Sequence, residues 1–550
     1  MKKVLFALSF MLSIGLVAQE RPRLMVGIVI DQMRWDYLNR FSERFGEGGF
    51  KRLLNNGFSC DNLMIDYIPT YTAIGHTSVW TGSVPSIHGI AGNDYLKDGK
   101  WTYCTEDTTV VGVDGSGKPT GFAGQQSPRN LLATTVGDEL KLFSNFRSKV
   151  IGVALKDRAS ILPAGHAADG AYWFDDKTGR FITSTFYRKD LPEWVKKFND
   201  ERRIDQYLKG EWNTLFDIDT YKESQPDNSV YEGRYKGVKA PTFPYNLAQL
   251  KKDNGYGVIR SLPMGTTLTF DLAKAALEGE QLGLSDDHSD LLTVSVSTTD
   301  YIGHQFGTHA IELEDTYLRL DKDLEDFLNT LDAKVGKNNY IVFLTADHAA
   351  AHNISFLQDN KIGADAWNSR AERDLANQHL KQKFGVRQSL IRTLNNYQVF
   401  FYPDSITASG LTREAVREEA IRYFKNDPRY AYVIDMENIG RNSVPQTVLT
   451  RAINGYNRNR SGEIFLILQP GWYSNSAKKN ITGTTHGAWN AYDAHIPCLF
   501  MGKNIPHGRS QKPQHMTDIA PTACALLGIQ MPSGNVGNAI SEIVDPFLNK

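Results

Sequence analysis

Residues 24–31 read LMVGIVID, an apolar run that ends in an aspartate. The run lacks the apolar–polar alternation of a strand with one face in water, so it predicts a strand buried on both faces, as the strands of parallel sheets are. Asp31 then lies just past the carboxyl end of that strand. In open α/β sheets, binding and catalytic sites assemble at this place.

Similar short apolar runs recur along the chain, and helical patterns separate them. The clearest helix is expected over 311–331, where apolar residues recur at every third or fourth position. Strands that alternate with helices predict a doubly wound α/β fold, with a mostly parallel central sheet flanked by helices. The other strands are expected over 149–155, 291–297, 340–346, 463–469 and 497–501.

Two stretches interrupt this alternation. Residues 171 to about 255 are rich in aromatic side chains, lysine and aspartate, and residues 352 to about 461 are charged and mixed. We interpret both as cap segments inserted into a single catalytic domain over residues 20–550. A length of 550 residues is compatible with one large α/β unit that carries insertions.

The charge balance restricts the partners of the chain. Lys and Arg number 61 and Asp and Glu number 62, which leaves a net charge of -1. No global basic field is present to recruit nucleic acid, so no nucleic-acid partner is expected. With 41% hydrophobic and 22% charged residues, the chain is an ordinary globular protein and not a disordered or coiled-coil one. The sequence indicates no oligomeric state.

The first 19 residues have the pattern of a secretory signal peptide. Lys2 and Lys3 precede an apolar run over 4–17, and Ala18 and Gln19 offer a cleavage point before a polar stretch. The run is shorter than the ~20 residues that span a bilayer; an uncleaved membrane anchor is the alternative. We therefore expect a periplasmic or secreted protein with no stable membrane insertion after cleavage.

Cysteine usage excludes a disulfide scaffold. Cys60, Cys104, Cys498 and Cys524 are too few for one in a chain of this length, and none forms a C-x-x-C motif. An exported protein would allow Cys60 to pair with Cys104, and the sequence leaves this pairing open. Cys498 lies in an apolar run and is expected to be a buried small hydrophobic residue.

Four of the predicted strands run into chemically reactive side chains. Because the carboxyl ends of parallel strands meet at one edge of a sheet, we expect these side chains to converge although they are far apart in the sequence. The residues that follow the strands are Asp31, Asp300, Asp347 with His348, and Lys156.

Aspartate and histidine side chains in this part of the fold form a candidate metal-ligand set. Asp300 and His304 are four residues apart, so in a helical turn they share one face and can hold one ion. His486 lies in a glycine-flanked polar loop, TGTTHG. Mixed aspartate and histidine ligation suits zinc better than calcium or magnesium. The full set is Asp31, Asp300, His304, Asp347, His348 and His486, enough for two metals.

Each of these motifs taken alone is weak evidence. A single D-x-x-x-H motif is more commonly a surface or capping pair, and an aspartate after a strand commonly caps a helix. The other histidines near the motifs are interpreted as structural or as supports of the ligands. They are His76, His88, His309, His352 and His495.

Residues 69–92, PTYTAIGHTSVWTGSVPSIHGIAG, are dense in hydroxyl side chains and glycine. The stretch predicts a loop that enters a helix and presents a hydroxyl at the helix N-terminus, where the dipole and free N–H groups favour an anion. Such a hydroxyl would need a metal to become a nucleophile. The residues alone do not distinguish Thr70, Thr72, Thr77 and Ser78, and a capped helix start is the simpler interpretation.

Taken together, these motifs resemble the alkaline phosphatase superfamily. The loop over 69–92, D-Y-I-G-H-x-x-G, T-A-D-H and the late T-H-G occur in the order of that family. The likeness is greatest to PafA-type, phosphate-irrepressible alkaline phosphatases of the bacterial periplasm, and it extends over about residues 25–532. It implies an alkaline phosphatase-like fold. In it Thr72 matches the nucleophile, Asn93 the asparagine that follows it, and Lys156 and Arg158 a Lys-x-Arg pair.

The resemblance also implies a cofactor and a reaction. One Zn²⁺ would be held by Asp300, His304 and His486, and a second by Asp31, Asp347 and His348 together with Thr72. The substrate would be a small phosphate monoester, which Thr72 attacks to give a phospho-threonine intermediate. Asn93, Lys156 and Arg158 would bind the phosphoryl oxygens.

Other members of the superfamily remain as alternatives. A phosphodiesterase or nucleotide pyrophosphatase would use the same metal ligands, but a diester has one phosphoryl oxygen esterified, so the cationic pair Lys156 and Arg158 favours the monoesterase. A sulfatase needs C-x-P-S-R or S-x-P-S-R, which the sequence lacks. A cofactor-independent phosphoglycerate mutase would not carry a signal peptide. In a different class, a non-catalytic periplasmic protein that binds metal or phosphate would need the ligands alone.

Overall fold

The computed structural model describes residues 21–477 and 480–548. The predicted signal peptide, residues 1–19, lies outside these described residues. Within the described ranges, every helix is too short or too polar to cross a membrane.

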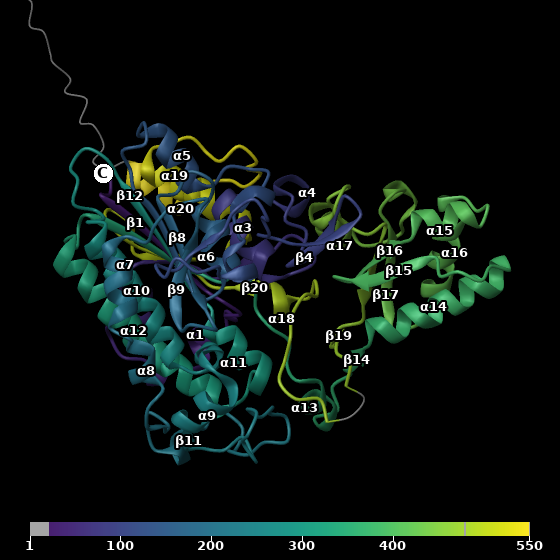
Figure 1. Cartoon of the computed structure of the whole chain (residues 1–550), viewed down its shortest axis with the longest axis horizontal. Coiled ribbons are helices and arrows are strands. Elements are labelled where there is room, and N and C mark those ends of the chain that lie inside the picture. Colours follow the sequence, from purple (N-terminus) through teal and green to yellow (C-terminus); the bar gives the residue numbers. More distant parts are fainter. Residues whose placement is uncertain (1–20, 478–479, 549–550) are drawn as a thin grey trace, which may run out of the picture.

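A mixed sheet forms the centre of the protein, and ten of its strands lie within the described ranges (Figure 1). The inner five run parallel to one another, and all their residues are buried, which agrees with their continuous apolar sequences. The predicted α/β fold with a mostly parallel core is therefore confirmed. These strands, in spatial order, are β13 (Tyr340–Thr345), β1 (Leu24–Ile30), β12 (Asp290–Val296), β7 (Val150–Ala154) and β8 (Gly170–Asp175).

The edges of the sheet depart from the parallel pattern. β21 (Cys498–Gly502) pairs antiparallel with β13, and β2 (Phe58–Cys60) pairs antiparallel with β21, with β22 (Gly508–Ser510) outside it. The prediction of a parallel strand over 497–501 was wrong in direction. An apolar run indicates that a strand is buried on both faces but does not indicate the direction in which the strand runs. At the opposite edge, β9 (Arg180–Ser184) and β6 (Gly112–Val113) are also antiparallel.

Part of the expected first cap segment belongs to the central sheet. The segment was expected to begin at residue 171, but β8 and β9 continue the sheet beyond β7. The aromatic residues of these strands are buried against the sheet and its helices. The chain leaves the sheet only after β9.

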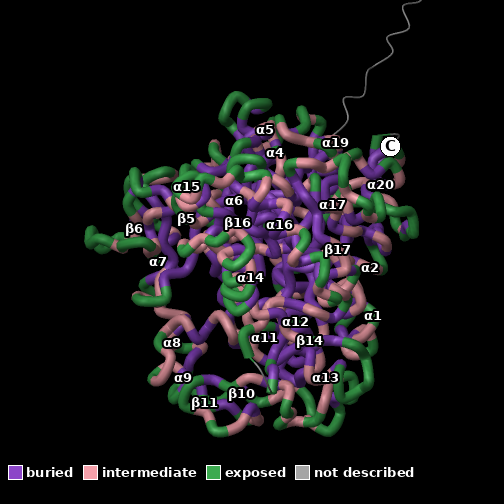
Figure 2. Tube along the Cα trace, turned by 90° about the vertical axis from the view of Figure 1, so that its right-hand side faces the viewer, coloured by how far each residue is buried: buried purple, intermediate pink, exposed green. Residues whose placement is uncertain are grey.

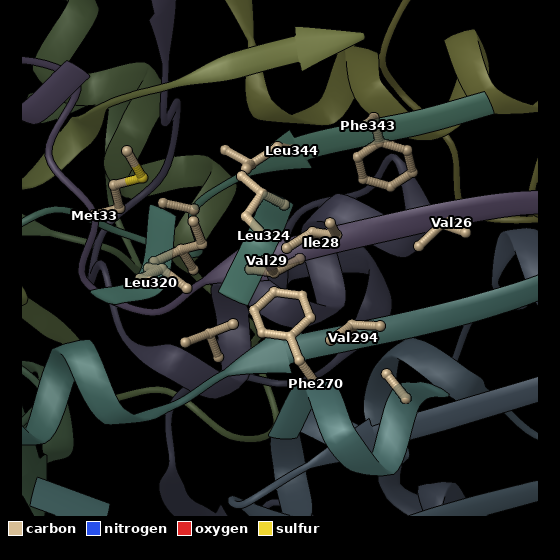
Figure 3. Close-up of a cluster of buried hydrophobic side chains, with 14 of the residues drawn as sticks. Val26, Ile28, Val29, Met33, Phe270, Val294, Leu320, Leu324, Phe343 and Leu344 are labelled. Carbon is tan, nitrogen blue, oxygen red and sulfur yellow. The ribbon is translucent and has the colours of Figure 1, made fainter. Parts of the chain in front are cut away.

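Helices cover both faces of the sheet. On one face, Figure 3 shows Ile28 of β1 and Val294 of β12 beside Phe270, Leu320 and Leu324. Phe270 belongs to α10 (Met264–Gly279), and the two leucines belong to α12 (Ile311–Lys334), which is the helix predicted over 311–331.

The other face is covered by α3 (Thr72–Thr81), α6 (Asp157–Ala164) and α19 (Ile519–Leu527). Gly27 decides how closely α3 approaches, since a Cβ at this position would lie 2.3 Å from the ring of Trp80. Residues with exposed surface lie mostly on outer loops and outward helix faces (Figure 2).

A second lobe projects from the main body, on the right of Figure 1. It has its own antiparallel sheet in the order β15 (Ile391–Asn395), β16 (Gln398–Phe401), β18 (Ile464–Leu468), β17 (Tyr430–Asp435). The helices α14 (Ser369–Phe384) and α16 (Arg413–Lys425) pack on this sheet around a separate hydrophobic core. The strand predicted over 463–469 therefore exists but was wrongly assigned to the central sheet, and the lobe continues past residue 461.

Shorter elements connect these layers. They are α1 (Tyr37–Arg40), α2 (Phe50–Asn56), β3 (Leu63–Met64), α4 (Pro85–His88), β4 (Asp94–Lys97), β5 (Lys100–Tyr103), α5 (Val136–Phe143), α7 (Glu193–Asp200), α8 (Arg203–Tyr207), β10 (Glu211–Trp212), β11 (Tyr245–Asn246), α9 (Leu247–Asn254), α11 (Thr298–Phe306), α13 (Ile354–Asp359), β14 (Asp365–Trp367), α15 (Pro403–Ala408), α17 (Gln446–Gly455), β19 (Trp472–Ser474), α18 (Ala491–Ala494), β20 (His495–Ile496), β23 (Gln514–His515) and α20 (Ser541–Leu548).

The four cysteines are free and buried. Cys60 packs in the main core, whereas Cys104 belongs to a separate apolar cluster with Tyr95 and Leu162, so the Cys60–Cys104 disulfide is not formed. Cys60 instead lies opposite Cys498, because the antiparallel register of β2 and β21 pairs Ser59 with Leu499. Cys498 is buried, as predicted.

Buried carboxylates on the first turns of α12 anchor the segment over 209–246. Asp315 accepts hydrogen bonds from Trp212 Nε1 at 2.7 Å and from the Tyr221 hydroxyl at 2.6 Å. Glu312 accepts one from the Tyr245 hydroxyl. These polar contacts attach an aromatic-rich insertion to the main body. Loss of the insertion's hydroxyl and indole donors would leave buried carboxyl groups without partners, which is strongly unfavourable.

Replacement of Glu312 by glutamine is expected to stabilise the protein at alkaline pH. Burial raises the pKa of Glu312 from 4.5 to about 8, so the folded chain keeps a proton that the unfolded chain releases. Stability from this group is therefore present below pH 4.5 and is lost as the pH rises toward 8, by at most about 1.4 kcal/mol per pH unit. Glutamine stays neutral and can still accept from Tyr245.

Thermal unfolding of Glu312→Gln and wild type at a series of pH values between these limits checks this expectation. The melting temperature of the variant should match wild type at the acid end and exceed it increasingly toward the alkaline end. Glu47→Gln, at an exposed position, controls for the loss of a surface carboxylate. Equal melting temperatures across the range would contradict the raised pKa.

Candidate metal centre

The carboxyl ends of the parallel strands bring the predicted residues together. Asp31 directly follows β1, and Asp347 follows β13 after one residue. Asp300 lies in the first turn of α11, which begins just after β12, and Lys156 precedes the first residue of α6. All four side chains are buried. The strand order β13-β1-β12-β7 therefore places four distant segments in one site.

Six side chains form two groups of three candidate ligands. Within each group the ligand atoms lie within 4.8 Å of one another. The groups adjoin, because the rings of His348 and His486 are stacked with centroids 3.4 Å apart. One group is Asp300, His304 and His486; the other is Asp31, Asp347 and His348. These are the two sets that the family resemblance implies.

Backbone carbonyls orient the three histidines. The Nδ1 atom of His304 lies 2.8 Å from Thr484 O, that of His348 lies 3.0 Å from Ala349 O, and that of His486 lies 2.7 Å from Thr70 O. An Nδ1–H that donates to a carbonyl leaves the Nε2 lone pair for a metal, which is how metal-binding histidines are commonly held.

Two carboxylate oxygens support the fit to a cation. Asp31 Oδ1 and Asp347 Oδ2 are buried and have no hydrogen-bond partner. Buried oxygens without partners are rare, because each loses its hydration without compensation. Since each of these residues lies in a group that includes a histidine Nε2, the donor set fits a divalent ion such as zinc.

Lys156 lies between the two groups and supplies positive charge. Its Nζ is 2.6 Å from Asp31 Oδ2 and 2.6 Å from Asp300 Oδ2. Burial nevertheless raises the pKa of Asp31 to about 6, and burial together with the charge of Asp31 raises the pKa of Asp347 well above its usual value. Against the effect of burial, His304 and Lys156 hold the pKa of Asp300 well below its usual value. Three buried aspartates thus surround the single ammonium of Lys156, which contacts two of them.

Thr72 is the first residue of α3, and its hydroxyl faces the ligands. Thr72 Oγ1 lies 3.3 Å from His348 Nε2. An added Cβ at Gly75 would lie 2.1 Å from Asp347 O, so glycine is what lets this helix start approach the β13 end. The other candidate hydroxyls contact different partners: Thr70 bonds Ala488 O, Thr77 bonds Ala73 O, and Ser78 contacts His88.

Asn93 and Arg158 lie where they can offer N–H groups beside Thr72 and Lys156. Asn93 Oδ1 accepts from the backbone N–H of Ala73 at 3.0 Å, which leaves its Nδ2 as a donor. Arg158 donates to the Tyr103 hydroxyl at 3.0 Å, while its buried Nε has no hydrogen-bond partner. Lys156 and Arg158 also help to line a cavity of about 400 Å³, together with Tyr103 and Tyr301, the residue after Asp300.

Several supporting residues were not predicted from the sequence. Tyr103 positions Arg158 and also donates to Asp157 at 2.6 Å. Gln32, next to Asp31, donates to ligands of both groups. Neither residue belongs to a recognisable motif, and their contacts arise only when distant segments meet. His76, interpreted as structural or as a support, has its Nε2 3.6 Å from Asp347 Oδ2.

The chain is similar to known proteins over nearly its whole length. Residues 25–489 match the model of the family described as type I phosphodiesterase / nucleotide pyrophosphatase. A relative from Myroides odoratus, named calcium-transporting ATPase, is 53% identical over 96% of this chain and 95% of its own length. Alkaline phosphatase PafA from Elizabethkingia meningoseptica is 52% identical over the same shares of the two chains.

Two solved structures of alkaline phosphatase PafA also match, each with a TM-score of 0.91 and each covering 95% of this chain and 99% of its own. The wild-type crystal structure is 52% identical in sequence. The other, at 51% identity, is of a variant in which a threonine is replaced by serine and an asparagine, a lysine and an arginine are replaced by alanine.

Lys156→Met is expected to destabilise the metal-free protein and to have a smaller effect once metal is added. The substitution removes the ammonium that bridges Asp31 and Asp300 and leaves buried carboxylates without this partner, a change that costs about 3–5 kcal/mol. Divalent cations bound by the two ligand groups would supply the missing positive charge. Melting temperatures measured with a chelator and then with added Zn²⁺ check this.

Lys337→Met serves as the control, because its side chain is 76% exposed. It should behave like wild type in both conditions. A Lys156→Met variant that melts at the wild-type temperature in the presence of chelator would show that Lys156 does not neutralise the cluster.

Proposed function

The chain belongs to the type I phosphodiesterase/nucleotide pyrophosphatase family of the alkaline phosphatase superfamily, and we propose on this premise that it is a secreted, zinc-dependent phosphate monoester hydrolase. The observation that carries the proposal is the position of Thr72. Its hydroxyl, at the N-terminus of α3, lies 3.3 Å from Nε2 of His348, which belongs to one of the two three-residue ligand groups, while Lys156 and Arg158 line a cavity beside Tyr301, the residue after Asp300.

Asp300, His304 and His486 would hold one Zn²⁺, and Asp31, Asp347 and His348 would hold the other. When bound, the two ions supply Lewis acidity that lowers the pKa of a hydroxyl and neutralises charge on a leaving oxygen. The three Nδ1 contacts to backbone carbonyls would keep the Nε2 atoms directed toward the ions.

The chain's own residues then carry the reaction in two displacements. Thr72 Oγ1 attacks phosphorus, the bond to the ester oxygen breaks, and phospho-Thr72 forms while the alcohol leaves. Water attacks the same phosphorus in the second step, which releases phosphate and restores the Thr72 hydroxyl. The N-terminal end of α3 favours the negative charge that gathers there.

Three side chains are suited to bind the nonbridging phosphoryl oxygens. Asn93 contributes an amide donor, Lys156 a point charge and Arg158 a fork of N–H groups. A monoester presents three such oxygens and therefore gains from all three donors. A diester has one of these oxygens esterified, so the pair Lys156 and Arg158 favours monoesters.

The relatives support this assignment. The residue types changed in the PafA variant are those of Thr72, Asn93, Lys156 and Arg158, and the threonine and asparagine are 21 residues apart in both chains. The lysine and arginine are likewise separated by one residue in both. The names of two relatives, alkaline phosphatase PafA and calcium-transporting ATPase, both describe cleavage of a phosphate bond.

The location and organisation of the protein are part of the same proposal. The pattern of residues 1–19 supports export to the periplasm or secretion. We take residues 20–550 as one catalytic unit with inserted cap segments, acting on small phosphate monoesters and not on nucleic acid.

Purified protein is expected to release phosphate from an aryl phosphate and to contain about two zinc ions per chain. Thr72→Ala should lower kcat/KM by about 10³-fold or more because it removes the nucleophile. Its zinc content should stay near that of wild type, since the six Asp and His ligands remain. Colorimetric phosphate release and elemental analysis of the same sample measure both quantities.

Thr72→Ser is the matched control, because it keeps a hydroxyl at the same position and should retain measurable turnover. Full activity in Thr72→Ala would contradict the assigned nucleophile. Zinc-loaded wild type without turnover of any phosphate ester would contradict the proposed reaction.

The preference for monoesters gives a separate expectation. Wild type should hydrolyse an aryl phosphate monoester faster than the matching diester. Arg158→Ala should lower kcat/KM for the monoester by about 10²–10³-fold, and by a smaller factor for the diester. Initial rates on the two substrates with both proteins test this, and faster diester hydrolysis by wild type would favour a phosphodiesterase instead.

A further inference from the structure

We propose that Gln32 is a positioning residue that couples the two metal-ligand groups, holding Asp300 and Asp347 in the orientations that bind metal. The inference rests on the two-metal function proposed above. Gln32 directly follows Asp31 and is only 3% exposed. Its side chain and its backbone contact different ligand groups, so one residue links both.

The two contacts of Gln32 are both donations to ligand carboxylates. Its side-chain Nε2 lies 2.6 Å from Asp300 Oδ1, in the first group. Its backbone N–H donates to Asp347 Oδ1 at 3.1 Å, in the second group. Because an ionised carboxylate only accepts hydrogen bonds, it is the NH₂ side of the amide that faces Asp300.

These donations orient Asp347. Its Oδ1 accepts from the backbone N–H groups of Gln32 and His348, at 3.1 and 3.0 Å. The other oxygen, Oδ2, is left buried and without a hydrogen-bond partner. Hydrogen bonds therefore hold the Asp347 carboxylate by Oδ1 and leave Oδ2 free to bind a metal ion. Metal-ligating carboxylates are commonly oriented by hydrogen bonds of this kind.

The backbone of Gln32 is in an unfavourable conformation for its residue type. Its φ is +65°, in the left-handed region, which is unfavourable for a residue with a side chain because the Cβ approaches the carbonyl oxygen too closely. Glycine would adopt this conformation without that cost. Non-glycine residues persist in it where the surroundings hold them, and such positions cluster at functional sites.

Helix α11 has a glycine, Gly303, where the side-chain amide of Gln32 packs against it. A Cβ added at Gly303, the residue before His304, would lie 1.9 Å from Gln32 Oε1. The amide thus lies between Gly303 and Asp300, with its oxygen against the helix and its nitrogen on the ligand. The close packing fixes the rotamer of Gln32 and, through it, that of Asp300.

The test compares zinc binding with fold stability in Gln32→Gly. This variant loses the amide but keeps the backbone N–H on Asp347 and removes the unfavourable φ. We expect its affinity for one of the two zinc ions to fall by about 10–100-fold, while the melting temperature of the metal-free protein stays at or above that of wild type. Competition with a chromophoric chelator measures the affinities, and thermal unfolding in chelator measures the stability.

Two further variants separate the effect of the Gln32 amide from the effect of the backbone conformation. Gln32→Asn tolerates the left-handed φ but its amide is one methylene shorter, so it should lose zinc affinity as Gln32→Gly does. Gln281→Gly is the matched control, because Gln281 is an exposed glutamine with φ +55°. It lies two residues before Gly283, which packs against Leu24 at the start of β1, the opposite end of the strand from the ligands. Its replacement should leave both zinc affinities unchanged.

The outcomes are distinguishable. Wild-type zinc affinities at both sites in Gln32→Gly would overturn the inference. A lower melting temperature of the metal-free variant with unchanged affinities would also overturn it, because Gln32 would then serve the fold alone. Failure of the wild-type protein itself to bind two zinc ions would instead overturn the proposed function on which the inference rests.

Discussion

Three aspartates buried in one cluster create the requirement on which the rest of the site depends. Asp31, Asp300 and Asp347 are almost fully removed from water, and an isolated buried carboxylate is strongly unfavourable. The surrounding residues can neutralise this negative charge in two ways. Lys156 contributes an ammonium that contacts two of the aspartates, and the oriented histidines complete two groups in which a divalent cation would contribute the remainder.

The aspartates stay close together, despite their mutual repulsion, because a stiff scaffold holds them. Each aspartate follows a parallel strand that is buried along its whole length, so neither the strand ends nor their spacing can relax easily. Glycine at two positions lets α3 pack closely: Gly27 makes room for Trp80, and Gly75 lets the helix start lie against the Asp347 segment. The hydroxyl of Thr72 is therefore placed by packing on the sheet and not by a flexible loop.

The second lobe is joined to the chain on both sides of that helix. Gly455 of α17 lies against Ile68, where a Cβ would be 1.6 Å from the backbone oxygen. Arg460 donates to the backbone oxygen of Asn130 at 2.7 Å and also bonds Gly89. Asn396, in the turn after β15, donates to Asp94 O at 3.0 Å, next to Asn93. These contacts attach the lobe to the segments before and after α3 and to Asp94, the residue that follows Asn93.

The sequence alone determined which residues meet, because continuous apolar runs identify buried strands and the residue after each run lies at a common sheet edge. In this way Asp31, Asp300, Asp347 and Lys156 were predicted to converge. Only the tertiary structure decided that β21 runs antiparallel and that β18 belongs to another sheet. The hydroxyl residues of the loop alone did not single out Thr72; the family resemblance implied it, and the structure places its hydroxyl 3.3 Å from His348 Nε2. The structure alone also revealed the contacts of Gln32. Periodicity reports how deeply a segment is buried, whereas strand direction, backbone φ and hydrogen-bond partners are set by segments that are distant in the chain.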